Sequence, residues 1–206
     1  MGTLRGLRSL KENMIDYLDR LARDALDTIK SGYYESTQKV AENKIISLKE
    51  SLMHADGNPV IAEIKGASPS RGEIKEKINP IGLAKKMMRG GAAGLSVLTE
   101  PKHFNGSIKY LSEIRKIYPY PILMKDFILV KEQLSSANRS GASAILLIYK
   151  LFERGYSEIG IDEMIKRAHK IGLEVLLETH SVEEFKAAIQ TEADLVGINN
   201  RDLRTL

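Results

Sequence analysis

Several apolar segments of this chain end in side chains that could donate protons, accept protons or bind an anion. These side chains occur in four segments: Glu63 and Lys65 close Pro59–Lys65, Lys125 lies within Pro121–Val130, Glu178 closes Leu173–Thr179, and Asn199 and Arg201 follow Leu195–Ile198. Together they combine ammonium, carboxylate, amide and guanidinium groups, a set that suits acid–base chemistry on a small anionic substrate. We predict that four strands deliver these side chains to one rim.

The first of these segments shows why the charges are informative. Side chains alternate across a strand, so Glu63 and Lys65 point the same way as Ile61, whereas Ala62 and Ile64 point the other way. A buried charge is costly unless it is paired or used. Two interpretations fit, a structural salt bridge or a chemical site at the carboxyl end of the strand. The recurrence of the pattern on three later segments favours the site.

Each of these residues also has a structural explanation when it is taken alone. Lys125 could be an ion-pair partner of Glu63 or Glu178, and Glu178 could cap the helix that follows it. Asn199 and Arg201 are common hydrogen-bonding residues in loops. Only the combination predicts a site, and the sequence leaves open which pKa values are shifted there.

Strands and helices alternate along the chain from Pro59 onward. The predicted strands are Pro59–Lys65, Gly94–Thr99, Pro121–Phe127, Ala144–Tyr149, Leu173–Thr179 and Leu195–Asn199. Helical patterns lie between them, at Pro80–Arg89, Ile108–Ile117, Lys131–Arg139, Ile161–Ile171 and Val182–Gln190. This alternation predicts an α/β fold with a parallel sheet that is covered on both faces.

The chain before residue 57 has a different pattern. Leu18, Ala22 and Ala25 recur at three- and four-residue spacing, which predicts an amphipathic helix. Ser36 or Thr37 could cap a second helix that continues through about Met53. We therefore predict a helical extension over residues 1–56 and a single α/β unit over residues 57–206.

Two architectures fit the α/β unit, a (β/α)8 barrel and an open doubly wound sheet. The first strand is not followed by Gly-x-Gly-x-x-Gly, which weakens the dinucleotide-binding version of the open sheet. Polar residues at the ends of several different strands are typical of barrel active sites. A barrel is therefore favoured, although only six strands are visible, two units fewer than a complete barrel.

Composition argues against several classes of protein. The 206 residues are 43% hydrophobic and 28% charged, with a net charge of +4 and no cysteine. Disulfides and thiolate metal sites are thus excluded, and no apolar run is long enough for a membrane span. Basic residues are mixed with acidic ones, which argues against nucleic-acid binding. The four histidines have no metal-like spacing, and His169 is expected on a helix surface. We expect a cytoplasmic protein.

Five motifs of the chain resemble those of the indole-3-glycerol phosphate synthase family. They are Ile61-Ala-Glu-Ile-Lys-Gly-Ala-Ser-Pro-Ser-Arg-Gly72, Leu95-Ser-Val-Leu-Thr-Glu100 with Phe104-Asn-Gly-Ser107, Pro121-Ile-Leu-Met-Lys-Asp-Phe127, Leu176-Leu-Glu178 and Gly197-Ile-Asn-Asn-Arg-Asp-Leu203. Their order and spacing match the family from the N-terminal helices to the last residue. The resemblance implies a (β/α)8 barrel with an N-terminal helical extension.

The resemblance also implies a reaction. The family converts 1-(2-carboxyphenylamino)-1-deoxyribulose 5-phosphate to indole-3-glycerol phosphate in tryptophan biosynthesis, a carboxy-lyase reaction that releases carbon dioxide and water without a cofactor. By resemblance, Lys125 protonates the ketone oxygen as the aryl ring attacks, and Lys65 contacts the anionic substrate and serves dehydration. Glu178 is the implied acid–base residue that removes the ring proton or assists the loss of hydroxide.

Further residues complete the implied site. Glu63 would hold and polarise the lysines, Asn199 would position the hydroxyl or the acid–base carboxylate, and Arg201 would support substrate anions. The family also has a loop serine and apolar walls for the aryl ring, which match Ser68, Phe104, Phe127 and Leu146. The implied partner is a phosphorylated small molecule, with neither nucleic acid nor a membrane, and the complete barrel would be a monomer.

Two departures from the family pattern are visible. Gly66 stands where the family usually has Arg or Lys, which alters the loop more than the acid–base set. The family continues with a seventh and an eighth strand whose loops form the phosphate site, so the resemblance implies a C-terminally truncated member. The alternative is an inactive six-unit fragment that folds or self-associates through exposed edges. A different phosphate-handling barrel fits the motifs poorly.

Overall fold

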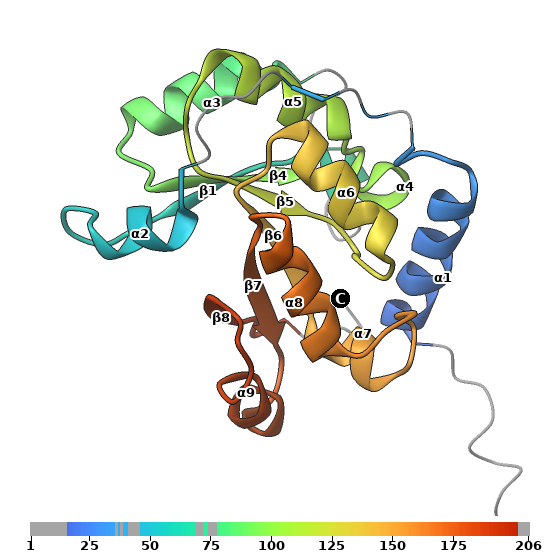
Figure 1. The fold of residues 1–206 in the computed structure, drawn as a ribbon. Coiled ribbons are helices and arrows are strands. Elements are labelled where there is room, and N and C mark those ends of the chain that lie inside the picture. Colours follow the sequence, from blue (N-terminus) through green and yellow to red (C-terminus); the bar gives the residue numbers. More distant parts are fainter. Residues whose placement is uncertain are drawn as a thin grey trace, which may run out of the picture.

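The computed structural model describes residues 16–35, 37, 39–40, 46–68, 72–73 and 78–201, without the side chains of residues 67–68 and 72–73. Its centre is a parallel six-stranded sheet in the order β1-β4-β5-β6-β7-β8. The strands are β1 (Ile61–Ile64), β4 (Gly94–Leu98), β5 (Ile122–Lys125), β6 (Ala144–Ile148), β7 (Glu174–Thr179) and β8 (Leu195–Ile198). The sheet curls into a half-barrel, and the carboxyl ends of all its strands lie at one rim (Figure 1).

Helices cover the convex face of this sheet (Figure 1). They are α3 (Pro80–Arg89), α5 (Ile108–Ile117), α6 (Lys131–Ser140), α8 (Ile161–Lys170) and α9 (Val182–Ala188). Alternate strand residues face them: Ile122 and Met124 of β5 are buried in the same cluster as Leu111 and Ile114 of α5. Because the other residues of each strand point away from these helices, the strand ends can present polar groups on the concave face.

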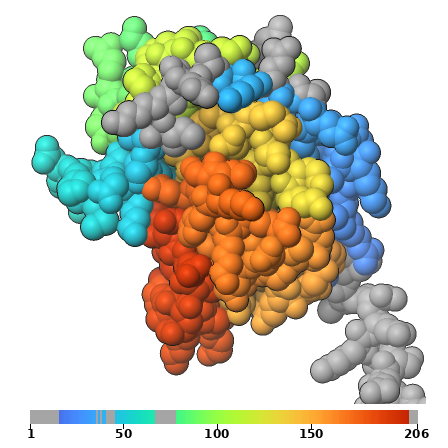
Figure 2. All heavy atoms as spheres, viewed as in Figure 1, coloured from blue at the N-terminus to red at the C-terminus, as the bar shows by residue number. Residues whose placement is uncertain are grey.

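The helix α1 (Tyr17–Lys30) packs against the concave face. Its buried residues Leu18 and Leu21 share an apolar cluster with Leu123 of β5 and Leu146 of β6. The same cluster includes Leu129, in the segment after β5, and Leu151 of α7 (Tyr149–Glu153), and Figure 2 shows α1, in blue, beside the yellow and orange surface of this part of the chain. The helix α1 thus covers part of the concave face, where the strands of a parallel sheet would otherwise expose apolar side chains.

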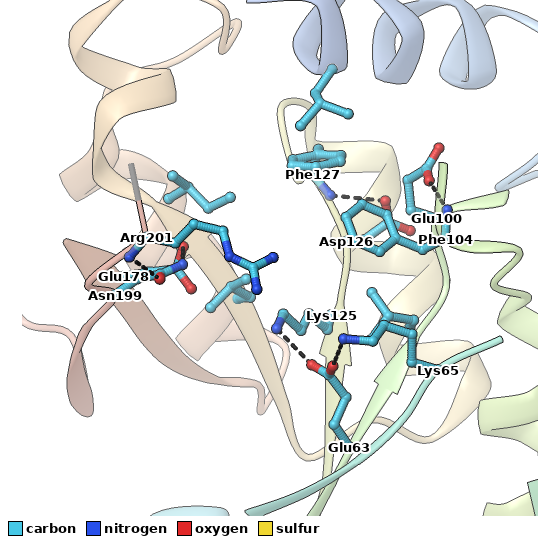
Figure 3. Close-up of a pocket in the computed structure, with 14 residues that line it drawn as sticks. Glu63, Lys65, Glu100, Phe104, Lys125, Asp126, Phe127, Glu178, Asn199 and Arg201 are labelled. Atoms are coloured by element: carbon cyan, nitrogen blue, oxygen red, sulfur yellow. Dashed lines mark hydrogen bonds and ion pairs between the residues drawn. The ribbon is translucent and has the colours of Figure 1, made fainter. Parts of the chain in front are cut away.

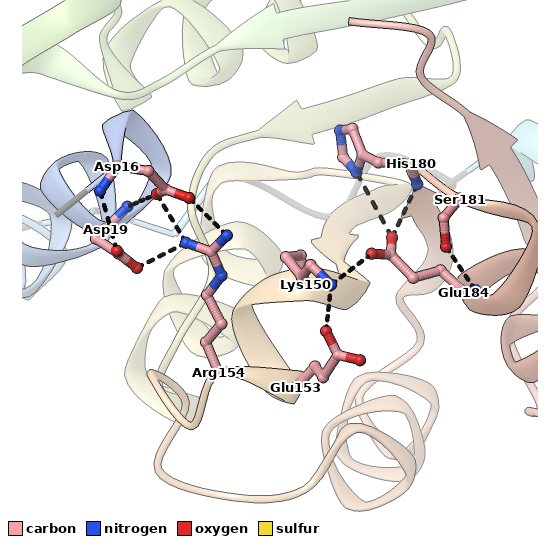
Figure 4. Close-up of polar contacts among 8 residues, drawn as sticks. All are labelled: Asp16, Asp19, Lys150, Glu153, Arg154, His180, Ser181 and Glu184. Atoms are coloured by element: carbon pink, nitrogen blue, oxygen red, sulfur yellow. Dashed lines mark hydrogen bonds and ion pairs between the residues drawn. The ribbon is translucent and has the colours of Figure 1, made fainter. Parts of the chain in front are cut away.

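Polar contacts fix the start of α1. Asp16 and Asp19 form a reciprocal capping box at its N-terminus. Arg154, which follows α7, places Nη2 at 2.7 Å from Asp16 Oδ2 and Nη1 at 2.7 Å from Asp19 Oδ1 (Figure 4). Tyr156 donates its hydroxyl to Asp19 at 2.9 Å. These bonds attach the helix to the loop that follows α7.

The helix α2 (Leu48–Met53) lies near the opposite, amino-terminal end of the strands. Its N-cap is Ser47, and its first backbone amides donate to the carboxylate of Glu174, at 2.7 Å from Leu48 and 3.1 Å from Lys49. Leu48 is fully buried in the concave-face cluster. A side chain at the start of β7 therefore caps a helix more than a hundred residues earlier in the chain.

The predicted α/β class and barrel-type architecture are confirmed. The six strands begin and end within two residues of the predicted bounds, and their sheet order follows the chain order without the reversal of a doubly wound sheet. The predicted second helix is wrong in its start. Thr37 is not helical and bonds to Tyr34, whereas α2 begins after Ser47. Ser36 and residues 41–45 lie outside the described residues.

Four short elements were not predicted. They are α4 (Pro101–Phe104), α7, and the two-stranded pair β2 (Ala67–Ser68) and β3 (Gly72–Glu73). Each is too short to produce a periodic pattern in the sequence. In the part of the chain that the structure describes, no helix is both long and apolar enough to cross a membrane.

Candidate active site

A pocket opens on the concave face where the carboxyl ends of the strands meet (Figure 3). It is lined by strand ends, by loop residues and by one residue of α1: Leu21, Glu63, Lys65, Leu98, Glu100, Phe104, Lys125, Asp126, Phe127, Leu146, Ile148, Glu178, Asn199 and Arg201. Every predicted site residue except Ser68 is among them. Ser68 lies in β2, and its side chain is outside the described part of the structure.

One side of the pocket, the lysine side, consists of Glu63, Lys65 and Lys125. Glu63 lies between the two lysines: Lys125 Nζ donates to its Oε2 at 2.6 Å, and Lys65 Nζ lies 2.7 Å from its Oε1. Burial raises the pKa of Glu63, but the charge of Lys125 and then the contact with Lys65 outweigh it, so that the pKa falls below its usual value. The carboxylate therefore stays ionised and holds both ammonium groups, one at each of its oxygens.

The opposite side, the glutamate side, consists of Glu178 and Asn199, and Glu178 is also contacted by His180, which does not line the pocket. Asn199 Nδ2 donates to Glu178 Oε1 at 3.1 Å, and His180 Nε2 lies 3.2 Å from the same oxygen. Burial raises the pKa of Glu178, but its interactions with His180 and Asn199, together with the charge of Lys125, hold that pKa below its usual value. No hydrogen bond or ion pair from a described residue reaches Oε2. This carboxylate thus has one held oxygen and one open oxygen.

The sheet register brings Asn199 beside Glu178. Glu178 is paired with Gly197 in the β7–β8 ladder, and the Asn199 amide donates to Thr179 O at 2.9 Å. The backbone amide of Arg201 donates to Asn199 Oδ1 at 3.0 Å, which turns Nδ2 of that side chain toward the carboxylate. Figure 3 shows the Arg201 guanidinium extending into the space between the glutamate side and the lysine side.

Apolar side chains form a wall between the two polar sides. The rings of Phe104 and Phe127 lie 6.1 Å apart between centroids and are tilted by 51°. Leu146 lies on β6, between the strands of Lys125 and Glu178, and is almost fully buried. Leu21 adds a contribution from α1 that no sequence pattern indicates, because it depends on how the helix docks. Such a wall suits a planar aromatic ligand.

Asp126 lines the pocket and was not singled out from the sequence. It is 3% exposed and accepts hydrogen bonds from Tyr34 Oη at 2.9 Å, Thr99 Oγ1 at 2.5 Å and the Phe127 amide at 2.8 Å. Burial raises its pKa to about 6. Its position directly after Lys125, inside an apolar run, is a signal that could have identified it.

A second buried acid, Glu100, has a structural role. Its carboxylate accepts the backbone amides of residues 102, 103 and 104 at 2.9, 2.7 and 3.1 Å. These are the first amides of α4, so Glu100 caps this helix and holds Phe104 at the pocket wall. The Glu-Pro pair at the start of α4 is a helix-start signal that is visible in the sequence.

The structure supplies a physical reason for Gly66. A Cβ at this position would lie 2.9 Å from the backbone oxygen of Asn105, closer than such atoms approach. Asn105 itself has a left-handed backbone, with φ of 48°. An Arg or Lys in place of Gly66 would therefore require the loop after α4 to move.

Metal ligands are not grouped in the described residues: no three His, Asp or Glu side chains there could hold one ion. His169 lies on the exposed surface of α8, as predicted, and contacts Asp194 at 2.8 Å. His103 contacts Asp24 of α1 at 2.8 Å.

Comparison with known proteins gives a consistent result. The sequence profile of a family described as indole-3-glycerol phosphate synthase matches residues 18–206. The chain is 43% identical over 176 residues to an indole-3-glycerol phosphate synthase of Carboxydothermus hydrogenoformans, which covers 82% of this chain and 65% of that protein. It is 40% identical over 188 residues to that of Methanocaldococcus jannaschii, covering 89% of this chain and 68% of that protein.

A third relative, from Lactococcus lactis subsp. cremoris, is 45% identical over 152 residues, or 74% of this chain and 57% of that protein. The chain thus spans less than two thirds of the length of the Carboxydothermus and Lactococcus proteins that it matches. The family match over residues 18–206 includes all the residues that line the pocket, so the family similarity and the pocket geometry concern the same region.

Proposed function

Because this chain belongs to the indole-3-glycerol phosphate synthase family, we propose that its pocket closes the indole ring of indole-3-glycerol phosphate. The substrate would be 1-(2-carboxyphenylamino)-1-deoxyribulose 5-phosphate, and the reaction would serve tryptophan biosynthesis in the cytoplasm. One observation carries the proposal. On one side of the pocket Lys65 and Lys125 share the carboxylate of Glu63. On the other side Glu178 has one oxygen without a described partner, and an apolar wall joins the two sides.

Charge and shape support binding of this substrate. The substrate carries a carboxylate and a phosphate, and the pocket offers the cations of Lys65, Lys125 and Arg201. Its anilino ring would lie against Phe104 and Phe127. Because these groups come from separate strands and loops, the substrate would be oriented before it reacts.

The first chemical step would be ring closure. The aryl carbon that bears the carboxylate attacks the ketone carbon, and the electron pair of the carbonyl moves to oxygen. Lys125 is proposed to donate a proton to that oxygen, because its ammonium is directed into the pocket by Glu63. Carbon dioxide then leaves, and the electron pair of the broken bond restores the aromatic ring.

The second part would be dehydration. The new hydroxyl leaves as water with a proton from Lys65, and Glu178 accepts the proton of the neighbouring ring methylene through its open oxygen. The depressed pKa of Glu178 keeps the carboxylate ionised and ready to accept a proton at neutral pH. Asn199 would hold the other oxygen of that carboxylate still.

The proposal is tested by ring formation itself. This chain is mixed with the substrate and the indole product is followed by its fluorescence, with low protein background because the chain has no tryptophan. We expect the initial rate to rise in proportion to the protein concentration. A rate equal to that of the Lys125→Ala chain under the same conditions would overturn the proposal.

The sheet edge favours a second candidate role, self-association. In the described structure β1 and β8 each pair with one strand, and Ile198 on β8 is 68% exposed. Light scattering across a range of protein concentrations separates the two roles. A constant monomer mass together with turnover supports the enzyme alone, whereas a rising mass without turnover supports an assembly module.

A further inference from the structure

His180 occupies a place that the proposed chemistry does not use. It lies two residues after Glu178 in the chain, directly after β7, and its side chain is 11% exposed. Its Nε2 lies 3.2 Å from Glu178 Oε1, and its Nδ1 lies 3.8 Å from Glu184 Oε2. The imidazole ring therefore lies between two carboxylates, one in the pocket and one outside it.

Neither ring nitrogen is in hydrogen-bond geometry with a described group, although both are buried. Buried polar atoms of this kind usually have partners, so their absence calls for an explanation. A protonated ring carries an N–H at each nitrogen and would present one to each carboxylate after a small rotation. Five groups surround the ring or its two carboxylates: Glu178 of β7, Glu184 of α9, Lys150 of α7, Asn199 after β8 and Lys125 of β5.

Glu184 is itself firmly held. Its side chain is 4% exposed, its Oε2 accepts the backbone amide of His180 at 2.8 Å, and its Oε1 lies 3.1 Å from Lys150 Nζ (Figure 4). Lys150 also pairs with Glu153 in the same helix. Glu153, Lys150 and Glu184 thus form a chain of ion pairs that leads to the imidazole ring of His180.

These contacts end at the oxygen of Glu178 that Asn199 also holds. Two groups from different elements therefore act on Oε1, while Oε2 has no described partner. A carboxylate that is held on one oxygen has a defined direction for the other. The arrangement matters for function only if Glu178 exchanges a proton with substrate, so the inference rests on the proposed function.

We propose that His180 is a positioning residue, which is held by Glu184 and Lys150 and fixes Oε1 of Glu178 so that Oε2 faces the substrate. It does not touch substrate itself. A purely structural histidine would influence folding alone, whereas a positioning histidine also influences the ionisation of Glu178 and the rate of the step that uses it.

Two conservative variants distinguish the contributions of the two ring nitrogens of His180. In His180→Gln the side-chain amide lies near the position of Nε2 and retains a donor to Glu178, whereas in His180→Asn it lies near Nδ1 and retains only a donor toward Glu184. The matched control is His54→Gln, because His54 is exposed and contacts only Glu50 of its own helix among the described residues. Circular dichroism confirms that each variant folds.

The primary readout does not need turnover. Carbon-13 NMR of labelled glutamate carboxyls follows the titration of Glu178, whose signal is identified by its loss in Glu178→Gln. We expect the pKa of Glu178 to rise in His180→Asn, to rise less in His180→Gln and to stay unchanged in His54→Gln, since His180 favours the ionised form. Equal titration in all four proteins would overturn the inference.

The second readout is the rate of indole formation. We expect kcat to fall about tenfold in His180→Asn with KM unchanged, and to recover in part in His180→Gln, the scale of one hydrogen bond to a charged group. A loss of kcat that is equal in the two variants would contradict the inference. If no protein forms indole, the proposed function fails, and the carboxyl titration still decides whether His180 acts on Glu178.

Discussion

The two sides of the pocket hold carboxylates in similar places and treat them differently. Glu63 and Glu178 both project from strands onto the concave face near the carboxyl rim. Glu63 has an ammonium group on each oxygen, at 2.7 and 2.6 Å. Glu178 has Asn199 and His180 on one oxygen only, and its side chain is 14% exposed against 26% for Glu63. Both oxygens of Glu63 therefore have a charged partner, whereas only one oxygen of Glu178 has described partners.

This difference assigns different chemistry to the same side-chain type. Glu63 cannot accept a proton without loosening two ion pairs, so it suits the task of orienting the lysines. Glu178 can accept a proton at its open oxygen while Asn199 keeps the other in place. In the proposed reaction, environment rather than residue type decides which carboxylate exchanges protons, as in enzymes that use two carboxylates.

The largest expected effect comes from the lysine side. Lys125→Ala removes the proposed proton donor, and we expect kcat for ring closure to fall about 10³-fold, within the range of general acid catalysis. The matched control is Lys166→Ala, an exposed lysine on α8, which should retain the wild-type rate. Circular dichroism should show both variants folded. Near-normal turnover in Lys125→Ala would remove the lysine side from the chemistry.

The buried acid that follows Lys125, Asp126, can be tested by pH. Asp126 has a pKa raised from 3.8 to about 6 by burial, so the folded protein binds its proton more tightly than the unfolded chain. Its contribution to stability is therefore complete below pH 3.8 and is lost as pH rises through about 6, on the order of 3 kcal/mol. Urea unfolding at pH 4.5 and at pH 7.5 measures this loss. The free energy of unfolding of the wild type, relative to that of Asp126→Asn, should be lower at pH 7.5 than at pH 4.5. A constant difference would show that Asp126 has an ordinary pKa.

On the glutamate side, Glu178→Gln keeps the shape and the contact with Asn199 but removes the proton acceptor. We expect kcat to fall about 10²-fold with little change in stability. Glu183→Gln is the control, because Glu183 is exposed in the first turn of α9. If both glutamine variants turn over alike, the open oxygen of Glu178 has no catalytic task.

The smallest effect should come from the residue that holds Glu178. Asn199→Ala removes one hydrogen bond to Oε1 and should lower kcat about tenfold, while Asn199→Asp would place like charges together and lower it further. Asn200→Ala, at the next position, is the comparison variant. If the Asn199→Ala variant has the same kcat as wild type, the hydrogen bond from Asn199 to Oε1 of Glu178 is not needed for turnover.

Much of this site could be predicted from the sequence because strand alternation is strict. Glu63 and Lys65 share a face by parity, and the repeated polar endings placed Lys125, Glu178 and Asn199 at one rim. The division into a helical extension and an α/β unit near residue 57 stays a prediction. Packing over long sequence distances could not be anticipated.

Three features illustrate that limit. Leu21 reaches the pocket only because α1 docks on the concave face, and no local pattern specifies that docking. His180 follows a strand and resembles an ordinary loop residue, since its partner Glu184 lies on the next helix. The helix predicted from residue 36 or 37 failed because Ser47 and the distant carboxylate of Glu174 set the start of α2.

The most direct test compares the two carboxylates in one assay of indole formation, with Glu63→Gln beside Glu178→Gln. Removing the charge of Glu63 leaves two ammonium groups unneutralised, so we predict a lower KM for the anionic substrate and a modest loss of kcat. Glu178→Gln should lose kcat with KM nearly unchanged. If the two variants lose kcat equally and share the same KM, the two carboxylates do the same work, and the division of roles between the sides of the pocket is wrong.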